Sequence, residues 1–299
     1  MQLLKSITDI HEPTLIVITG PTASGKSALA VDVAERLGTG IISADSRQVY
    51  RGIPIVTAMP TDDERSRVPH HLIDMLPLDA YYSAAEFERD ALALTRRMLS
   101  EKGVAVVCGG SMLYVDALCH GIDELPTVPD SIRDSLKQEH DSHGDGWLLE
   151  ELRRVDPEYY EVVDRRNMKR VFHAVEIVRA AGTTYTSLRT GQRRQREFKI
   201  RKILLDPPRD VLFDRINRRV DAMVRDGLEE EARSVYPMRA LNSLNTVGLK
   251  EMFAWFDGTM DRTTAIERIK KNTRVYAKKQ MTWRKRETDW ERIVPDYNE

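Results

Sequence analysis

Gly20-Pro21-Thr22-Ala23-Ser24-Gly25-Lys26-Ser27 is the stretch of sequence that decides the fold. It matches G-x-x-x-x-G-K-[ST], the phosphate-binding P-loop. Leu15-Ile16-Val17-Ile18 before it predicts a short buried strand, and residues 27–37 after it predict a helix. In that setting the glycines let backbone N–H groups curl around a phosphate, the helix N-terminus adds a positive dipole, and Lys26 adds a full charge. The stretch therefore predicts a site for a di- or triphosphate.

The first third of the chain continues as alternating strands and helices. Residues 41–43 and 104–108 are predicted strands, and residues 83–101 have helical periodicity with a capping box at Ser83 and Glu86. This alternation predicts an α/β fold, a P-loop NTPase-like parallel sheet wrapped by helices. Ligands of such sheets bind at the carboxyl ends of the strands. The P-loop, the segment after 41–43 and Gly109-Gly110-Ser111 should therefore surround one crevice.

The middle of the chain changes character after Pro126 and Pro129. Residues 130–191 read as mostly helical, with turn signals at 143–146. A strand at 202–205 and four further helices are then predicted, at 211–225, 228–236, 249–256 and 263–285. We expect a P-loop catalytic core made of residues 1–120 and 200–299, with a helical insertion domain at 121–199.

Composition excludes several classes of protein. The chain has 299 residues, of which 41% are hydrophobic, and no apolar run approaches the ~20 residues that span a bilayer. The charged first residues are unlike a signal peptide, and two cysteines make no disulfide framework. We expect a cytoplasmic protein with no membrane partner.

Charge is gathered in blocks along the chain. Residues 164–202 carry 12 basic and 3 acidic residues, and residues 264–286 carry 9 basic and 1 acidic. Such blocks favour a polyanion-binding face, the alternative being solvated helix faces.

Three groups of side chains could carry chemistry. Asp45, just past the second strand, could hold magnesium indirectly or act as a general base, or could simply cap a turn. Arg215 and Arg219 share one helix face and would stabilise a leaving pyrophosphate or a transferring phosphoryl group. The alternative is that both lie on a surface helix and pair with acidic residues of the same helix. In residues 274–286, cations, Gln280 and two aromatics at helical spacing could bind nucleic acid, or the aromatics could pack inwards.

Five motifs, in order, resemble one family. They are Gly-Pro-Thr-Ala-Ser-Gly-Lys-Ser (20–27), Asp-Ser-Arg-Gln-Val-Tyr-Arg-Gly (45–52), Pro-His-His-Leu-Ile-Asp (69–74), Gly-Gly-Ser-Met-Leu-Tyr (109–114) and Lys-Lys-Gln-Met-Thr-Trp (278–283). Together they are similar to the tRNA dimethylallyltransferases, also called tRNA isopentenyl transferases, over residues 15 to 290. The resemblance implies transfer of a dimethylallyl group from dimethylallyl diphosphate to N6 of adenine 37 of tRNA, with Mg²⁺ and release of diphosphate.

The resemblance also implies functions for individual residues. Asp45 matches the catalytic acid, proposed as general base, and Arg219 matches the arginine that steadies the diphosphate. The P-loop residues Gly20, Pro21, Thr22, Ala23, Ser24, Gly25, Lys26 and Ser27 would hold the diphosphate, with Ser27 near Mg²⁺. The positions that match tRNA contacts are Asp45, Ser46, Arg47, Gln48, Ser111, Arg133, Lys169, Arg170, His173, Lys250, Lys278, Lys279, Gln280, Trp283 and Arg284.

The chain departs from the family pattern at a few positions. Ser27 and Ser111 stand where Thr is common, which keeps the hydroxyl, and Leu249 stands where an aromatic is usual. The chain ends at Glu299 without the zinc-finger extension of eukaryotic members, so we expect a bacterial type and a monomer that grips the anticodon stem-loop. The P-loop pattern also predicts nucleotide binding, ATP included.

Two other functions remain open from the sequence. A P-loop small-molecule or nucleotide kinase would use the same loop, although the basic blocks have no evident use in it. An NTP-gated RNA-binding module would use the basic blocks without chemistry.

Overall fold

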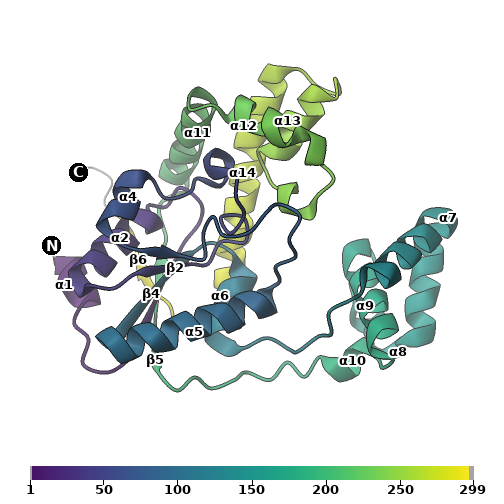
Figure 1. The fold of residues 1–299 in the computed structure, drawn as a ribbon, viewed down its shortest axis with the longest axis horizontal. Coiled ribbons are helices and arrows are strands. Elements are labelled where there is room, and N and C mark those ends of the chain that lie inside the picture. Colours follow the sequence, from purple (N-terminus) through teal and green to yellow (C-terminus); the bar gives the residue numbers. More distant parts are fainter. Residues whose placement is uncertain (1, 296–299) are drawn as a thin grey trace. The chain divides into compact units, whose positions relative to one another are not determined.

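A parallel six-stranded sheet forms the centre of the computed structural model, which describes residues 2–295. The strands run in the order β3-β2-β4-β1-β5-β6, and every neighbouring pair is parallel. Their bounds are β1 Thr14–Thr19, β2 Ile41–Ser43, β3 His70–His71, β4 Val104–Gly109, β5 Lys199–Leu205 and β6 Glu291–Ile293. Every residue of β1 and β4 is buried, which is the reason that these central strands are continuous apolar runs. The predicted α/β class is confirmed (Figure 1).

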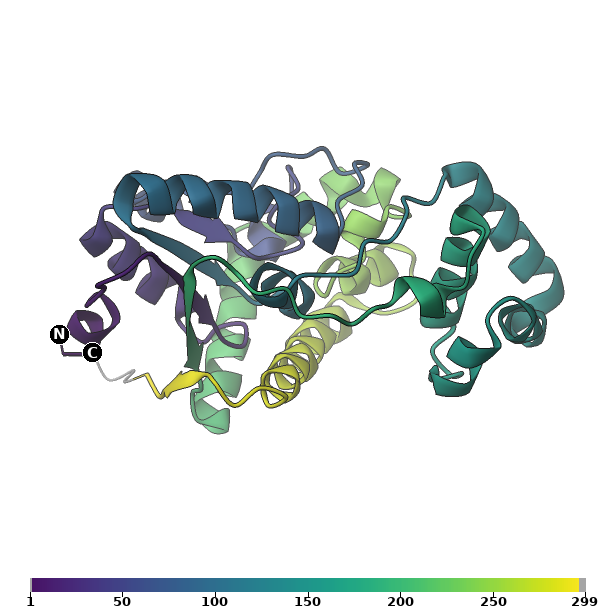
Figure 2. The ribbon, with the colours of Figure 1, turned by 90° about the horizontal axis from the view of Figure 1, so that it is seen from below.

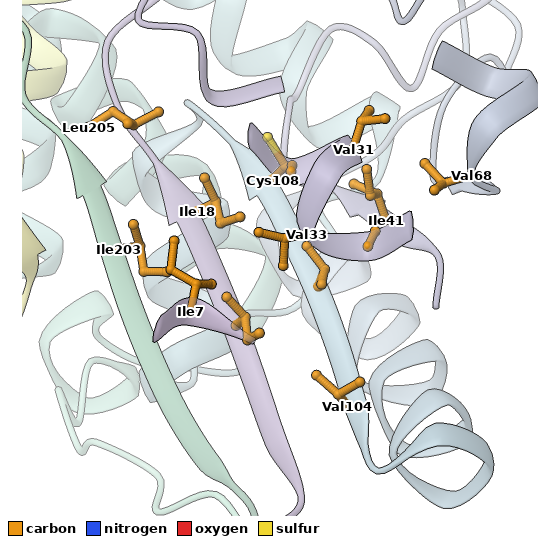
Figure 3. Packing of buried hydrophobic residues seen from close by; sticks show 14 residues of the cluster. Ile7, Ile18, Val31, Val33, Ile41, Val68, Val104, Cys108, Ile203 and Leu205 are labelled. Carbon is orange, nitrogen blue, oxygen red and sulfur yellow. The ribbon is translucent and has the colours of Figure 1, made fainter. Parts of the chain in front are cut away.

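Helices of the first third pack against this sheet. α2 (Lys26–Leu37) lays Ala30, Val33 and Ala34 on the face that carries Ile16, Ile18 and Val106, as Figure 3 shows for part of this cluster. α5 (Ala84–Lys102) contacts β4 and β1 along its length (Figure 2). Its predicted capping box is present, since Glu86 N–H donates to Ser83 Oγ at 3.3 Å and Ser83 N–H donates to Glu86 Oε2 at 2.7 Å. The remaining helices of this part are α1 (Gln2–Ile7), α3 (Pro54–Thr57), α4 (Asp62–Arg67) and α6 (Met112–His120).

The last third adds four helices and a second apolar core. They are α11 (Arg209–Arg225), α12 (Leu228–Val235), α13 (Leu249–Phe256) and α14 (Arg262–Arg284), with two short 3₁₀ turns, η1 (Tyr236–Met238) and η2 (Asn242–Leu244). Each helix lies within two residues of its predicted bounds. Val220, Leu228, Phe253 and Ile269, one from each helix, meet Ile53 in this core. The core therefore fastens α11 to α14 onto the segment that follows Asp45.

A separate compact unit is formed by residues 121–194, and residues 1–120 with 195–299 form the other. The smaller unit contains α7 (Asp130–Val155), α8 (Pro157–Val162), α9 (Met168–Ala181) and α10 (Tyr185–Leu188). Leu136, Leu148, Leu152 and Val175 are fully buried in its core. α7 breaks at Gly144, whose φ of 79° lies outside the helical range, at the place where the sequence has a turn signal.

Several short elements were absent from the sequence-based prediction. β3 and β6 have two and three residues, and at such lengths the period-2 pattern has no room to show. β5 begins at Lys199, three residues before the expected strand, because Lys199-Ile200-Arg201 pairs with β1. The prediction missed these residues because they are polar on average. These residues join the sheet through backbone hydrogen bonds, which the side-chain pattern does not report.

Asp156 is a buried carboxylate that joins α8 and α10 in the smaller unit. Asp156 is fully buried and accepts hydrogen bonds from Tyr159 N–H at 3.0 Å, Thr186 N–H at 2.7 Å and Thr186 Oγ1 at 2.8 Å. Asp156→Ala should destabilise this unit by about 3 kcal/mol, because it removes an N-cap and leaves buried donors unpaired. Hydrogen exchange of the α8 and α10 amides should become roughly a hundredfold faster. The exposed Asp134→Ala in α7 is the matched control, and equal exchange in both variants would contradict the prediction.

Candidate active site

The P-loop connects β1 to the N-terminus of α2. Gly25 caps α2 with φ of 85° and Ala23 has φ of 65°, so the loop turns twice through the left-handed region. Arg215 of α11 donates from Nε to Ala23 O at 2.9 Å and holds this strained turn in place. Lys26 Nζ donates to Pro21 O at 3.3 Å, so the ammonium folds back over the loop. Two side chains therefore hold the P-loop through its own backbone carbonyls.

Asp45 follows β2 and is oriented by its own segment. Its Oδ1 accepts from Arg47 N–H at 2.9 Å and from Gln48 N–H at 3.4 Å. The Gln48 side chain donates to Thr57 O and Ala58 O at 3.2 and 3.1 Å and accepts from Ser43 Oγ at 2.9 Å. The turn-capping geometry that the sequence left open is thus present. It engages one carboxylate oxygen, while Oδ2 accepts no hydrogen bond from the residues that the structure describes.

The loop after β4 is packed against the Asp45 segment. A Cβ at Gly109 would lie 2.1 Å from Ala44 O, so only glycine allows this approach. Ser111 N–H donates to Ala44 O at 3.1 Å, and Ser111 Oγ accepts from Ser46 N–H at 2.8 Å. Ser111 and Ser46 therefore belong to one hydrogen-bonded corner beside Asp45.

One cavity of about 510 Å³ opens between these loops. Polar groups from the P-loop, the Asp45 segment and α11 line it, and so do apolar side chains from α3, α11 and α12. The lining residues on which the chemistry depends are Thr22, Lys26, Ser27, Asp45, Arg219, Val56, Val220, Met223 and Leu228. The structure thus places Lys26, Asp45 and Arg219, which are far apart in the sequence, around the same space.

The electrostatics of the cavity favour an anion. Burial lowers the pKa of Lys26, and the nearby Arg219 lowers it further, although Cys108 and Asp45 act in the opposite direction. Burial likewise lowers the pKa of Arg219, and Asp45 and Glu64 offset this only in part. Both cations therefore hold their charge at a cost, which a multivalent anion between them would remove. Arg218, by contrast, points to the exposed Asp214, so one face of α11 serves the cavity and the other serves the surface.

The C-terminal segment divides into exposed and internal residues. Lys278 and Lys279 of α14 are exposed, as is Lys250 of α13, and Lys250 and Lys279 also line the cavity. Arg284 is 3% exposed and pairs with Asp116 at 3.1 Å, and the Trp283 indole N–H donates to the same carboxylate.

Gln280 is also internal. It is buried, and both ends of its amide bond to backbone. The sequence grouped Gln280, Trp283 and Arg284 with the tRNA contacts, and the structure shows Gln280 and Arg284 buried and Trp283 half-buried. Arg284 Nη2 has no hydrogen-bond partner among the described residues. Helical spacing alone could not separate the two faces of α14.

Four of the positions matched to tRNA contacts lie in the smaller unit, and two of them share one buried carboxylate. Arg133 Nε and His173 Nδ1 lie 3.1 and 2.8 Å from the two oxygens of the buried Glu176. Lys169 and Arg170 are exposed in the first turn of α9, where the helix dipole disfavours positive charge.

Sequence reasoning missed Glu231. This α12 residue is 9% exposed, and its Oε2 and Oε1 accept from Ile55 N–H at 2.7 Å and Val56 N–H at 2.8 Å. Burial raises the pKa of Glu231. Its position among Leu228, Ala232 and Val235 on the apolar face of α12 was the available signal.

Neither a metal cluster nor a membrane helix is found in the described part of the chain. Within residues 2–295, no three His, Cys, Asp or Glu side chains gather so as to hold a metal ion. None of the helices described over the same residues is long and apolar enough to cross a membrane.

The fold and the loop between β1 and α2 define a P-loop α/β protein. A family model described as IPP transferase matches residues 48–287, and the chain belongs to this family. tRNA dimethylallyltransferase 1 of Bacteroides thetaiotaomicron is 51% identical over 277 residues, covering 93% of this chain and 90% of that protein. tRNA dimethylallyltransferase 1 of Phocaeicola vulgatus is 50% identical over 283 residues, covering 95% and 94%.

Solved structures agree with the sequence relatives. The tRNA isopentenylpyrophosphate transferase of Bacillus halodurans superimposes with a TM-score of 0.68 at 35% identity, covering 96% of this chain and 92% of that one. The family suggested by the five motifs is therefore confirmed, and the kinase alternative is not favoured.

The hydrogen bonds of Glu231 to α3 predict that this side chain stabilises the fold. Glu231→Gln keeps the shape of the side chain but can accept only one of the two α3 amides, and it turns an N–H₂ group toward the other. The free energy of unfolding should fall by about 1–3 kcal/mol, measured by urea titration. Glu230→Gln, an exposed neighbour on the same helix, should leave it unchanged. Equal stability of the two variants would contradict the structural importance of Glu231.

Proposed function

We propose that this protein transfers the dimethylallyl group of dimethylallyl diphosphate to N6 of adenine 37 of tRNA and releases diphosphate. One observation carries the proposal: Lys26 and Arg219, two cations whose pKa values are lowered, line the same cavity as Asp45 beside a P-loop. The cations suit a diphosphate, and the carboxylate suits a nucleophile that must lose a proton.

The P-loop is proposed to hold the leaving group. In this reaction the bond between C1 of the prenyl group and the diphosphate oxygen breaks, and negative charge grows on that oxygen. Lys26 and Arg219, which line the cavity, and the amides at the N-terminus of α2 would meet this charge. No phosphoryl group moves, which agrees with β4 ending in Gly109 instead of the Asp that phosphoryl-transfer enzymes keep for Mg²⁺.

Asp45 is proposed as the general base. As the adenine N6 forms its bond to C1, one N6 proton must leave, and the carboxylate of Asp45 accepts it. The Arg47 and Gln48 amides hold Oδ1, so Oδ2 is the oxygen left for the proton. An adenine in a folded anticodon loop reaches the cavity only after it leaves its stack, so the base must be flipped out.

Mg²⁺ is proposed as the cofactor. It favours a few protein oxygens together with phosphate oxygens and water, over an all-protein cage. The Ser27 hydroxyl at the start of α2 fits this requirement, and the described residues contain no carboxylate cluster that would offer a competing cage. Bound there, the ion would neutralise part of the diphosphate charge.

The basic surfaces are proposed to bind the anticodon stem-loop. Lys250, Lys278 and Lys279 would contact phosphates near the cavity. In the smaller unit Arg133, Lys169, Arg170 and His173 would contact others, which accounts for the unfavourable cations at the start of α9. We further propose that the protein acts as a cytoplasmic monomer. A nucleotide such as ATP would compete with the prenyl donor for the same P-loop.

A direct assay tests the proposed function. The purified protein is incubated with unmodified tRNA, Mg²⁺ and dimethylallyl diphosphate, and the tRNA is digested and analysed by mass spectrometry. We expect one adenosine to gain a dimethylallyl group and diphosphate to be released. No gain with that donor, together with phosphate transfer from ATP, would reverse the assignment.

Asp45 gives the sharpest mutational prediction. Asp45→Asn keeps an oxygen for the Arg47 and Gln48 amides but removes the general base, so the single-turnover rate constant should fall about 10²- to 10⁴-fold. Binding of tRNA, measured by filter retention, should change by less than about twofold, because the Asp45 carboxylate contributes little to the contacts between the protein and the tRNA phosphates. Asp79→Ala, at an exposed aspartate, is the control. Near-normal turnover of the Asn variant would remove Asp45 from the mechanism.

A further inference from the structure

Gln280 joins two loops of the cavity through a single side chain. It lies on α14 with 4% of its surface exposed. Its Oε1 accepts a hydrogen bond from Thr22 N–H in the P-loop at 2.9 Å, and its Nε2 donates to Gly110 O after β4 at 2.9 Å. One amide therefore bridges the diphosphate-binding loop and the neighbouring strand end.

The space for this bridge is kept open by Gly110. A Cβ at Gly110 would lie 2.3 Å from Gln280 Nε2, and its next contacts, at 3.6 and 3.7 Å, are ordinary. Gly110 is not among the residues with positive φ, so its backbone conformation does not demand glycine. A side chain at this position would displace the Gln280 amide.

The bridge continues to the Asp45 segment. Ser111, the residue after Gly110, donates from N–H to Ala44 O at 3.1 Å and accepts from Ser46 N–H at 2.8 Å. Thr22, Gln280, Gly110, Ser111 and Ser46 thus form one continuous path of short contacts. Its first residue belongs to the loop proposed to hold the diphosphate, and its last is the neighbour of the proposed base.

We propose that Gln280 is a positioning residue that sets the spacing between the prenyl donor and Asp45. This inference rests on the proposed function. Gln280 acts through backbone and touches no substrate. A neutral amide suits the task because it presents one acceptor and one donor, whereas a carboxylate cannot donate and an ammonium cannot accept. Displacing reacting groups by about 1 Å can cost a hundredfold in rate, so a loose bridge would appear as lost kcat.

Gln280→Ala tests the inference with the full-length protein. In steady-state assays with tRNA and dimethylallyl diphosphate, kcat should fall about tenfold to a hundredfold. The KM for each substrate should change by no more than about threefold, because the groups that bind tRNA and donor are intact. Thermal unfolding is recorded on the same samples, so that activity is compared at a temperature where both proteins are folded.

The other outcomes each overturn the inference. A raised KM for tRNA at unchanged kcat would mean that Gln280 reads the tRNA. A lower melting temperature with unchanged kcat would mean that the bridge supports only the fold. A wild-type protein that transfers no prenyl group would overturn the proposed function and this inference with it, whereas an active wild type with unaltered Gln280→Ala kinetics would overturn the inference alone.

A double-mutant cycle gives an independent check. Gly110→Ala should lower kcat by itself, because the new methyl group displaces the Gln280 amide. In the Gln280→Ala background that methyl group has room, so Gly110→Ala should cause no further loss. Gly146→Ala, where a Cβ meets nothing within 4 Å, is the control and should leave kcat unchanged. Losses at Gly110 and Gln280 that multiply independently would contradict the bridge.

Discussion

The close approach of the loops that follow β2 and β4 is the constraint on which the site depends. Because β2, β4 and β1 are adjacent and parallel, their carboxyl ends emerge at one edge of the sheet. Gly109 allows the loop after β4 to touch the backbone of Ala44, and Ser111 and Ser46 fasten the two loops together. The P-loop lies beside them, so these contacts bring the P-loop and Asp45 to the same edge of the sheet.

The helices of the last third complete this edge. α11 supplies Arg215, which braces Ala23, and Arg219, which lines the cavity, while α12 supports α3 through Glu231. The buried carboxylate of Glu231 and the half-buried cations Lys26 and Arg219 lose part of their hydration, which costs free energy. Backbone amides satisfy Glu231, and an anion between Lys26 and Arg219 would offset the desolvation of these two cations.

Much of the core was predictable because it rests on local or periodic signals. The P-loop, the apolar runs of β1 and β4, the capping box of α5 and the helices α11 to α14 all carry such signals, and the structure has them nearly where they were expected. β3, β6 and the first residues of β5 were missed, since they pair through backbone and their side chains show no alternation. Two strands of three residues or fewer lie below the length at which pattern is informative.

The sequence and the tertiary structure determined different features of the site. Sequence alone determined that a P-loop is present, which family the chain resembles, and that Asp45 and Arg219 are candidate catalytic residues, because each motif is contiguous in the chain. Only the tertiary structure decided which side of each helix faces inwards. It made Gln280 and Arg284 internal while leaving Lys278 and Lys279 exposed, and it made Glu231 a support for α3. The physical reason is that a side chain's partners come from packing between distant segments, and the pattern of one helix cannot contain them.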